Sequence, residues 1–261
     1  MNLKVILSAL LVIVSFEGLT QNIYSALQHD RGVDLRTEPK VEELIVKTTF
    51  INKESTYTKK DVILVNSKHK IISETRFDKN GELESRLTKT FDSSDLRSLT
   101  RKLERWHPVL GYSFKTAYYT YDENGHLTKV QDKDQDDILY QETTITNNEN
   151  GDPIELVVRT SNSDQYGKEV AIYDYPNNRV ITKVLGNNGA VISESSITID
   201  FSVQMNDNTY NEFGDLIKSS KHEYEYKYDK HNNWTKKVIF KMVDGKRTRY
   251  QSITRKIKYL K

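Results

Sequence analysis

The sequence predicts an all-β protein of antiparallel β-hairpin repeats that form a long curled sheet or shell, with one amphipathic helix near residues 94–106. Two observations favour this fold: short runs of β-branched and aromatic residues alternate with polar turns, and a turn-like unit returns along the chain. Hydrophobic residues make up 36% of the 261 residues, and 16 residues are tyrosine. Tyrosine buries its ring while its hydroxyl stays in water, so we expect half-buried sheet surfaces.

The first twenty residues resemble a signal peptide. One positive charge in "MNLK" precedes the apolar run "VILSALLVIVSF", and "EGLTQN" follows it. The run is shorter than the roughly 20 apolar residues that span a bilayer. We therefore expect a signal peptide over residues 1–20, cleaved before Gln21, with a retained membrane anchor as the alternative. No later segment is apolar enough to span a membrane.

The chain contains no cysteine. Thiol catalysis, zinc–thiolate sites and a lipid anchor on cysteine are therefore excluded, and stability has to come from strand pairing and packing. An exported chain without cysteine, rich in Lys, Asn and Tyr, favours a bacterial location in the periplasm, on the cell surface or outside the cell.

Residues 21–40 lack sustained periodicity and are predicted to be an N-terminal arm or linker, followed by a single β-repeat domain over residues 41–261. The first strand signals are "VEELIVKTTF", "YTKKDVILV" and "KIISETRF". In "HEYEYKY", Tyr224, Tyr226 and Tyr228 alternate with charged residues, which is typical of a strand covered on one side.

The helix is predicted from "SSDLRSLTRKLERWHP". Its apolar residues recur at three- and four-residue steps: Leu96, Leu99, Leu103 and Trp106. This spacing gives a helix one apolar face. Ser93 or Ser94 can cap its start, and Pro108 stops its continuation.

The repeated unit "YDENGHL", from Tyr121, returns as "FDKNGEL" from Phe77, "YNEFGDL" from Tyr210 and "YDKHNNW" from Tyr228. Its central positions are Gly81, Gly125, Gly151, Gly189, Gly214 and Asn232. Asn is the residue after Gly that best tolerates positive φ, so a left-handed turn is predicted at all six. The preceding Asp or Asn opens the turn and an apolar residue starts the next strand, so each unit is a hairpin.

These units resemble the YD repeat of the Rhs family and of related secreted bacterial repeat proteins, over roughly residues 77–261. The resemblance implies hairpins laid side by side in a curled sheet. The central positions are spaced by 44, 26, 38, 25 and 18 residues, which indicates longer loops or hairpins without the signature. The toxin delivery of the large family members is not expected here.

No catalytic, cofactor or metal site is predicted. The carboxylates of "DKDQDD" alternate as in a calcium loop, but an EF-hand needs Gly and Glu where this chain has Asp137 and Thr143, so a solvated turn is favoured. The six histidines show no metal-ligand spacing, and no nucleophile motif accompanies them. We therefore expect a protein that is not an enzyme.

Charge is distributed unevenly. From Asp215 onward 14 Lys or Arg face 5 Asp or Glu, a net charge of +9 against +2 for the whole chain. A polyanion could bind the candidate residues Lys236, Lys237, Arg247, Arg249, Arg255 and Lys256. A soluble outer face with Lys at the sheet edge explains the same charges, and a pI near 8.4 argues against a nucleic-acid partner.

The sequence thus predicts an exported, non-enzymatic envelope or surface protein whose sheet is a binding or structural scaffold. Its expected partners are a cell-envelope glycan or another surface protein. Trp106, Trp234 and the tyrosines can serve either as a carbohydrate platform or as the core of a thin sheet. The alternatives are a polyanion-binding module, a divergent envelope-glycan hydrolase and, on the basic C-terminal strand, a secretion-sorting domain.

Overall fold

The computed structural model describes residues 22–29, 32–36, 39–52, 55–161, 166–200, 203–204, 208–243 and 246–260. The predicted signal peptide, residues 1–20, lies outside the described residues. No helix among the described residues is long and apolar enough to cross a membrane.

The described chain is nearly all-β, as predicted. Its strands are β1 (Val41–Ile51), β2 (Thr56–Val65), β3 (Ile71–Phe77), β4 (Leu83–Phe91), β5 (Ser98–His107), β6 (Gly111–Tyr121), β7 (Leu127–Lys133), β8 (Leu139–Asn147), β9 (Pro153–Thr160), β10 (Tyr166–Asp174), β11 (Arg179–Leu185), β12 (Val191–Thr198), β13 (Thr209–Tyr210), β14 (Leu216–Lys218), β15 (His222–Tyr228), β16 (Trp234–Val243) and β17 (Lys246–Tyr259). The short helices are α1 (Ile23–Leu27) and η1 (Tyr175–Asn177).

The chain divides into two compact units, each of which takes strands from separate stretches of sequence. The smaller unit comprises the described parts of Met1–His29, Thr120–Val130 and Tyr140–Phe201, and the larger unit comprises those of Asp30–Tyr119, Gln131–Leu139 and Ser202–Lys261. The single domain over residues 41–261 stays a prediction, because this division reflects contacts and not independent folding.

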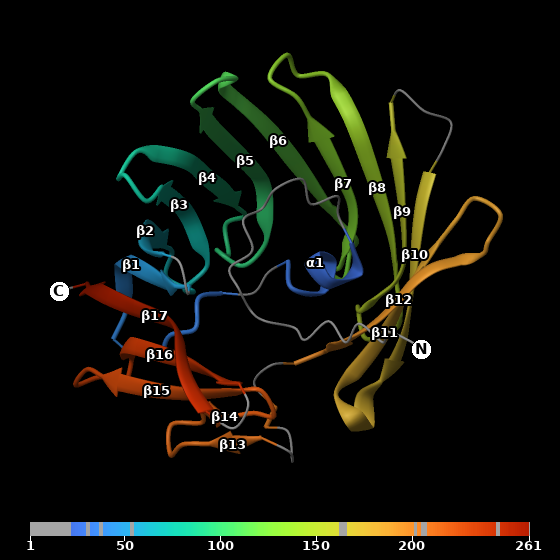
Figure 1. Cartoon of the computed structure of the whole chain (residues 1–261). Coiled ribbons are helices and arrows are strands. Elements are labelled where there is room, and N and C mark those ends of the chain that lie inside the picture. Colours follow the sequence, from blue (N-terminus) through green and yellow to red (C-terminus); the bar gives the residue numbers. More distant parts are fainter. Residues whose placement is uncertain are drawn as a thin grey trace. The chain divides into compact units, whose positions relative to one another are not determined.

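The larger unit contains an antiparallel sheet in which the C-terminal strand is central. Strand β17 pairs with β1 on one side and with β16 on the other. From β1 the order continues through β2, β3, β4 and β5 to β6, and from β16 it continues through β15 and β14 to β13. Within this unit the strand direction turns progressively from β15 to β6, so the sheet is curled (Figure 1).

The smaller unit contains the antiparallel run from β8 to β12. Helix α1 packs against β9 and β10. Its Ile23 is fully buried, and the Ile23 backbone N–H donates to Glu169 Oε2 at 2.7 Å. The Asn22 side chain caps this helix by accepting from the Ser25 N–H at 2.7 Å. Where the structure describes it, this half of the predicted N-terminal arm is therefore ordered by specific contacts.

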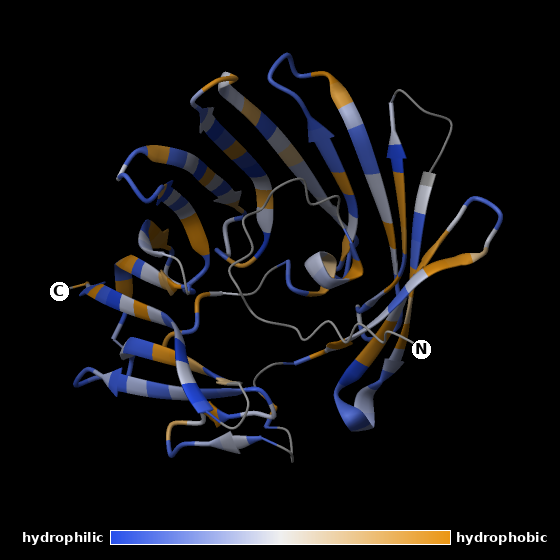
Figure 2. Cartoon of the chain, viewed as in Figure 1, coloured by the Kyte–Doolittle hydropathy of each residue, from blue (hydrophilic) through white to orange (hydrophobic). Residues whose placement is uncertain are grey.

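The core of the larger unit lies on one face of β1, β2 and β17, which we call the inner face. It is a cluster of Val41, Leu44, Val46, Ile63 and Val65, against which Val33 and Leu35 of the N-terminal arm pack. Side chains alternate between the faces of each strand, and residues paired across strands share a face. The resulting hydropathy alternation is visible along the strands in Figure 2.

The six predicted turn positions all have positive φ, from 58° at Asn232 to 86° at Gly125. Each is the fourth residue of a turn with the same two backbone hydrogen bonds. In the turn around Gly81, the Asp78 N–H donates to Glu82 O at 2.9 Å, and the Gly81 N–H donates to Asp78 O at 3.2 Å. Asp78 Oδ1 also accepts from the Asn80 and Glu82 N–H groups, so the first residue supports the reversal.

The same turn recurs at two places without glycine or asparagine at the fourth position, His69 and Asp137, with φ of 57° and 61°. Asp95, with φ of 62°, is the fourth residue of a turn one residue longer, in which the Asp92 N–H donates to Arg97 O. The turn ending at Ile138 accounts for "DKDQDD", because Asp134 Oδ1 accepts from the Asp136 and Ile138 N–H groups. The sequence analysis expected a turn at this place.

The predicted helix near residues 94–106 is wrong. Residues from Asp92 to Arg97 form one of these turns, and the rest lies in β5, which pairs with β4 and β6. Strand β4 pairs with β5 from Ser98 to Arg105 and β6 pairs with it from Thr100 to His107, and this pairing outweighs a weak helical propensity. Leu103 pairs with Leu87 on the inner face, whereas Trp106 lies on the outer face and Leu99 is 44% exposed.

We predict that Gly81→Val destabilises the protein by about 1–3 kcal/mol, because a β-branched residue resists positive φ. A Cβ at Gly81 would meet nothing within 4 Å, so the cost is conformational and not steric. Asn232→Gly, at the equivalent position of another turn, is expected to be neutral or stabilising. Urea denaturation of both variants tests this, and equal effects would contradict a shared turn conformation.

Candidate functional site

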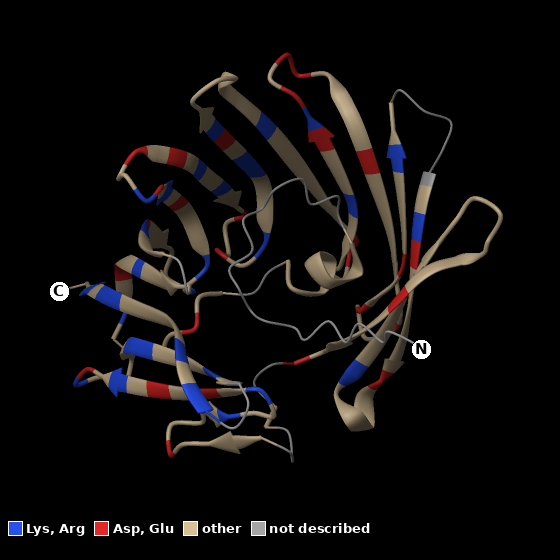
Figure 3. Cartoon of the chain, viewed as in Figure 1, with Lys and Arg blue, Asp and Glu red and all other residues tan. Residues whose placement is uncertain are grey.

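The six candidate basic residues of the C-terminal region do not form one patch. Lys237 pairs with Ile253, and Arg255 pairs with Val46, so both side chains lie on the inner face. The other four lie on the opposite, outer face: Lys236, Arg247, Arg249 and Lys256. Figure 3 shows Lys and Arg on β16 and β17 beside acidic residues on β15.

On the outer face, Arg247 is engaged by acidic and aromatic neighbours. Its Nε lies 3.0 Å from Glu223 Oε2, and its Nη2 lies 2.6 Å from Glu225 Oε1. The guanidinium also lies 3.6 Å from the ring centroid of Phe240. Arg249 and Lys256 are exposed. Polyanion binding at these residues stays a prediction.

On the inner face, Arg255 is a buried structural residue with 7% exposure. Its guanidinium lies 3.1 Å from the Trp234 ring centroid, and it donates to Trp234 O at 3.0 Å and to Asp34 O at 2.9 Å. Burial lowers the pKa of Arg255 to about 10. Burial also lowers the pKa of Lys237, whose Nζ lies 5.0 Å from the Tyr224 ring centroid.

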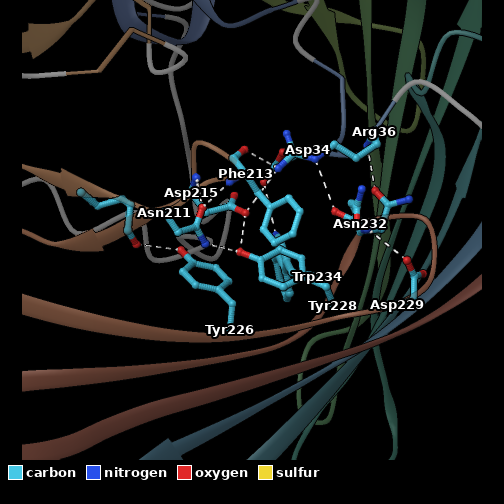
Figure 4. Close-up of polar contacts among 12 residues, drawn as sticks. Asp34, Arg36, Asn211, Phe213, Asp215, Tyr226, Tyr228, Asp229, Asn232 and Trp234 are labelled. Carbon is cyan, nitrogen blue, oxygen red and sulfur yellow. Dashed lines mark hydrogen bonds and ion pairs between the residues drawn. The ribbon is translucent and has the colours of Figure 1, made fainter.

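Residues 32–36 cross the inner face as a strap (Figure 4). The Val33 N–H donates to His69 O at 2.9 Å, and the Arg36 N–H donates to Asn233 Oδ1 at 2.7 Å. Arg36 Nη2 donates to Phe213 O at 2.6 Å and lies 3.4 Å from Asp215 Oδ2. The strap therefore joins three turns that are distant from it in sequence.

Three tyrosine hydroxyls form a hydrogen-bonded cluster with the turns that the strap contacts. Tyr228 donates to Asp215 Oδ2 at 2.6 Å and accepts from Asn211 Nδ2 at 2.6 Å, and Tyr226 donates to Leu216 O at 3.2 Å. Burial raises the pKa of both tyrosines. Tyr259 donates to Asp229, and burial raises its pKa to about 12. These tyrosines bond residues of the turns that the strap contacts, so the hydrogen bonds hold the strap in place.

Two buried carboxylates lie together farther along the inner face. Asp61 on β2 is 9% exposed and Glu74 on β3 is 8% exposed. Arg76 Nε donates to Glu74 Oε1 at 2.9 Å and lies 3.7 Å from Asp61 Oδ1. Burial, and then the charge of Glu74, raise the pKa of Asp61 to about 6. These are the carboxylates that the fold brings together for the hydrolase alternative, with Arg76 bound between them.

The outer face of β5 and β6 carries a row of aromatic side chains, Trp106, Tyr112 and Phe114, which we call the aromatic row. The Trp106 and Tyr112 centroids are 5.3 Å apart, and those of Tyr112 and Phe114 are 6.1 Å apart. Tyr112 is 47% exposed. The sequence analysis noted Trp106 but missed its partners, although Tyr112 and Phe114 stand two residues apart in "GYSFKTAYYTY", as outward-facing residues of a strand do.

Polar and charged groups border the aromatic row. Tyr112 OH donates to Glu104 Oε1 at 2.7 Å, and this hydrogen bond and burial raise the pKa of Tyr112. Lys102 Nζ lies 4.1 Å from the Phe114 centroid, and the Arg86 guanidinium lies 5.7 Å from Trp106. The row thus combines exposed ring surface with hydrogen-bonding groups and cations.

A scan against protein-family models finds no match for this chain, and a search of curated proteins finds none either. Among solved structures, a porin-like protein from Bacteroides uniformis is similar at 13% identity and a TM-score of 0.45, with 84% of this chain and 98% of that chain covered. A porin-like protein from Bacteroides vulgatus is similar at 11% identity and a TM-score of 0.33, with 83% and 98% covered.

The TcdB2–TccC3 complex is also similar, at 9% identity and a TM-score of 0.37, over 78% of this chain and 15% of that chain. At such low TM-scores these likenesses carry no argument about function. Membership of the YD-repeat family stays a prediction.

We predict that Asn233→Ala destabilises the protein by about 1–3 kcal/mol, because it leaves buried polar groups without partners. Asn233 is 2% exposed, accepts from the Arg36 N–H and donates to Tyr259 OH. Asn80→Ala, in an exposed turn, is the control and is expected to change stability by less than about 0.5 kcal/mol. Urea denaturation measures both, and a harmless Asn233→Ala would contradict the role of the strap.

We predict that Asp61 makes the protein less stable as pH rises. Its folded pKa of about 6 lies above the ordinary 3.8, so its stabilising contribution is present below pH 4 and is lost as pH rises through 6. The loss amounts to at most about 3 kcal/mol. Asp61→Asn should therefore gain stability relative to the wild type between pH 4 and pH 7.5, as measured by denaturation.

Asp78→Asn is a control for which stability is expected to change with pH in the opposite direction. Hydrogen bonds from the backbone, first that of Glu82, lower the pKa of Asp78. The stabilising contribution of Asp78 is present above the unfolded pKa of 3.8 and is lost as pH falls through its lower folded pKa. This variant should therefore lose stability relative to the wild type as pH rises in the range below about pH 5, and the difference should stay nearly constant from there to pH 7.5. Parallel pH profiles for the wild type and Asp61→Asn would show that Asp61 is not a perturbed group.

Proposed function

We propose that this protein is an exported, non-enzymatic component of the bacterial envelope or surface, and that its sheet is a scaffold whose outer face binds glycan. The observation that carries the proposal is the aromatic row of Trp106, Tyr112 and Phe114. Support for export comes from the signal-like residues 1–20 and the absence of cysteine.

The chemistry of the aromatic row suits a sugar chain. The C–H faces of pyranose rings are apolar and pack on aromatic rings, while their hydroxyls need hydrogen-bonding partners at the edge. Glu104 and Lys102 supply an acceptor and a donor beside Phe114 and Tyr112. The Trp106–Tyr112 contact crosses from β5 to β6 and the Tyr112–Phe114 contact runs along β6, so the three rings offer more than one stacking position. This favours an extended glycan over a single sugar.

The hydrolase alternative is less well supported by the same structure. A glycosidase needs a carboxylate pair that substrate can reach, with one member free to donate a proton. Asp61 and Glu74 are both nearly buried and share Arg76. This arrangement favours a structural ion cluster on the inner face.

We predict that Tyr112→Ala and Phe114→Ala each weaken glycan binding by about 3- to 10-fold, the effect of one lost aromatic contact. A screen against envelope glycans, run at low and at physiological salt, measures this. Lys256→Gln, an exposed outer-face change away from the row, is the control and should leave binding unchanged. Binding that falls steeply with salt and with Lys256→Gln would instead support the polyanion alternative.

A further inference from the structure

The hairpin that joins β5 to β6 ends in an exposed aliphatic tip. Val109 is 85% exposed and Leu110 is 82% exposed, the two largest exposures among the large hydrophobic residues of the described chain. Figure 2 shows this turn as a hydrophobic end on the hairpin. Covering such exposed aliphatic side chains with another apolar surface lowers the free energy.

The tip is ordered, and its backbone donors are already paired. His107 Nδ1 accepts from the Val109 and the Leu110 N–H groups, at 3.1 Å in each case. His107 pairs with Gly111, whose φ of 75° closes the turn. Transfer of a free N–H into an apolar medium is costly, so these two hydrogen bonds lower the cost of taking the tip out of water.

Side-chain types change in a fixed order with distance from the tip. Val109 and Leu110 come first, and the Trp106–Tyr112 pair lies next along the strands. The following pair is Glu104 with Phe114, and Lys102 comes after it. A bilayer presents the matching order, from acyl chains through the headgroup boundary, where Trp and Tyr are enriched, to charged groups in water.

The charge of the tip fits the same surroundings. From Arg105 to Tyr112 the sequence is "RWHPVLGY", which has one basic and no acidic residue. A second protein would cover a broad patch with an apolar centre and a polar rim. Val109 and Leu110 stand at the narrow end of one hairpin, and side-chain polarity is graded along its length, which favours a lipid surface as the occupant.

We propose that the β5–β6 tip is a membrane-interface anchor, in which Val109 and Leu110 enter the acyl boundary of a lipid bilayer and Trp106 and Tyr112 lie at headgroup level. This goes beyond the proposed function, because it needs no glycan. It assigns the aliphatic end of the hairpin to lipid and gives Trp106 and Tyr112, two members of the aromatic row, a contact with the headgroups, while Phe114 lies farther along β6.

The test is vesicle binding by the full chain and a tip variant. Vesicles of phosphatidylethanolamine and phosphatidylglycerol, and vesicles of phosphatidylcholine, are floated with the wild type and with the double variant Val109→Asn, Leu110→Asn. The double variant is expected to lose about tenfold or more of its partitioning, given the apolar surface removed. All variants carry the same N-terminal residues, so any contribution from residues 1–20 is common to them.

Ile172→Asn is the matched control, since Ile172 is 57% exposed on β10 of the smaller unit and is not part of the tip. It should bind vesicles like the wild type. In a Trp234→Phe background Trp106 is the only tryptophan, and its emission should shift to the blue and be quenched by brominated acyl chains. Both substitutions at the tip are on the surface, so circular dichroism and the urea midpoint should be unchanged.

Glycan binding is measured on the same variants, which separates the two proposals. Loss of vesicle binding by the double variant supports the anchor, whether or not the wild type binds glycan. If the wild type does bind glycan, the double variant should retain that binding. Absence of wild-type binding to both vesicle types overturns the anchor, as does equal binding by the wild type and the double variant. Equal losses for Ile172→Asn and the double variant also overturn it, because they would show unspecific hydrophobic adsorption.

Discussion

The constraint on which this fold depends is the reversal of the chain between paired strands within a few residues. In the recurring turn, this reversal uses one residue at positive φ and a partner for the backbone groups that the turn leaves unpaired. Gly supplies the first requirement at low cost, and an Asp or Asn three residues earlier supplies the second through its side-chain oxygen. Hydrogen bonds to Asp78 and Asp122 lower their pKa values, so these turns are strongest when the carboxylates are ionised.

The pairing of β17 with β1 is the second structural determinant, and it is wholly non-local. It places the last strand of the chain between β1 and β16, so the C-terminal strand is an interior element of its sheet. A deletion from Asp244 onward would therefore remove the hydrogen-bonding partner of both β1 and β16. Studies of binding by the C-terminal charges consequently require point substitutions. The strap stabilises this arrangement of β17. The Arg36 N–H donates to Asn233 in the turn before β16, and Arg255 of β17 donates to the Asp34 carbonyl oxygen.

The sequence was sufficient for the strands and for the glycine turns, because these features are local. The sequence was insufficient where the pairing of a segment with distant strands decides whether it forms a helix or a strand. Leu96, Leu99, Leu103 and Trp106 fit a helical period, yet Leu103 and Trp106 lie on opposite faces of a strand that two neighbours hold. The turns at His69, Asp95 and Asp137 lacked glycine, although Asn66, Asp92 and Asp134 gave the opening signal.

The candidate sites show the same division between local and non-local information. Lys236 and Lys237 are adjacent in sequence, but strand alternation sends them to opposite faces, so a basic run in the sequence is not a basic patch in the fold. The raised pKa of Asp61 depends on burial in the folded sheet and then on the charge of Glu74, which lies on another strand. Only the alternation of Tyr112 and Phe114 in β6 could have indicated the aromatic row beforehand.

Register connects the turns to the surface that the protein presents. The pairing of His107 with Gly111 sets Trp106 opposite Tyr112 and Glu104 opposite Phe114, which aligns the aromatic row on one face. A slip of one residue would bring Ser113 and Lys115 to that face and would turn the aromatic rings toward the inner side. Since His107 also pairs the amides of Val109 and Leu110, the closure of this one hairpin orders both the exposed aliphatic tip and the ring surface behind it.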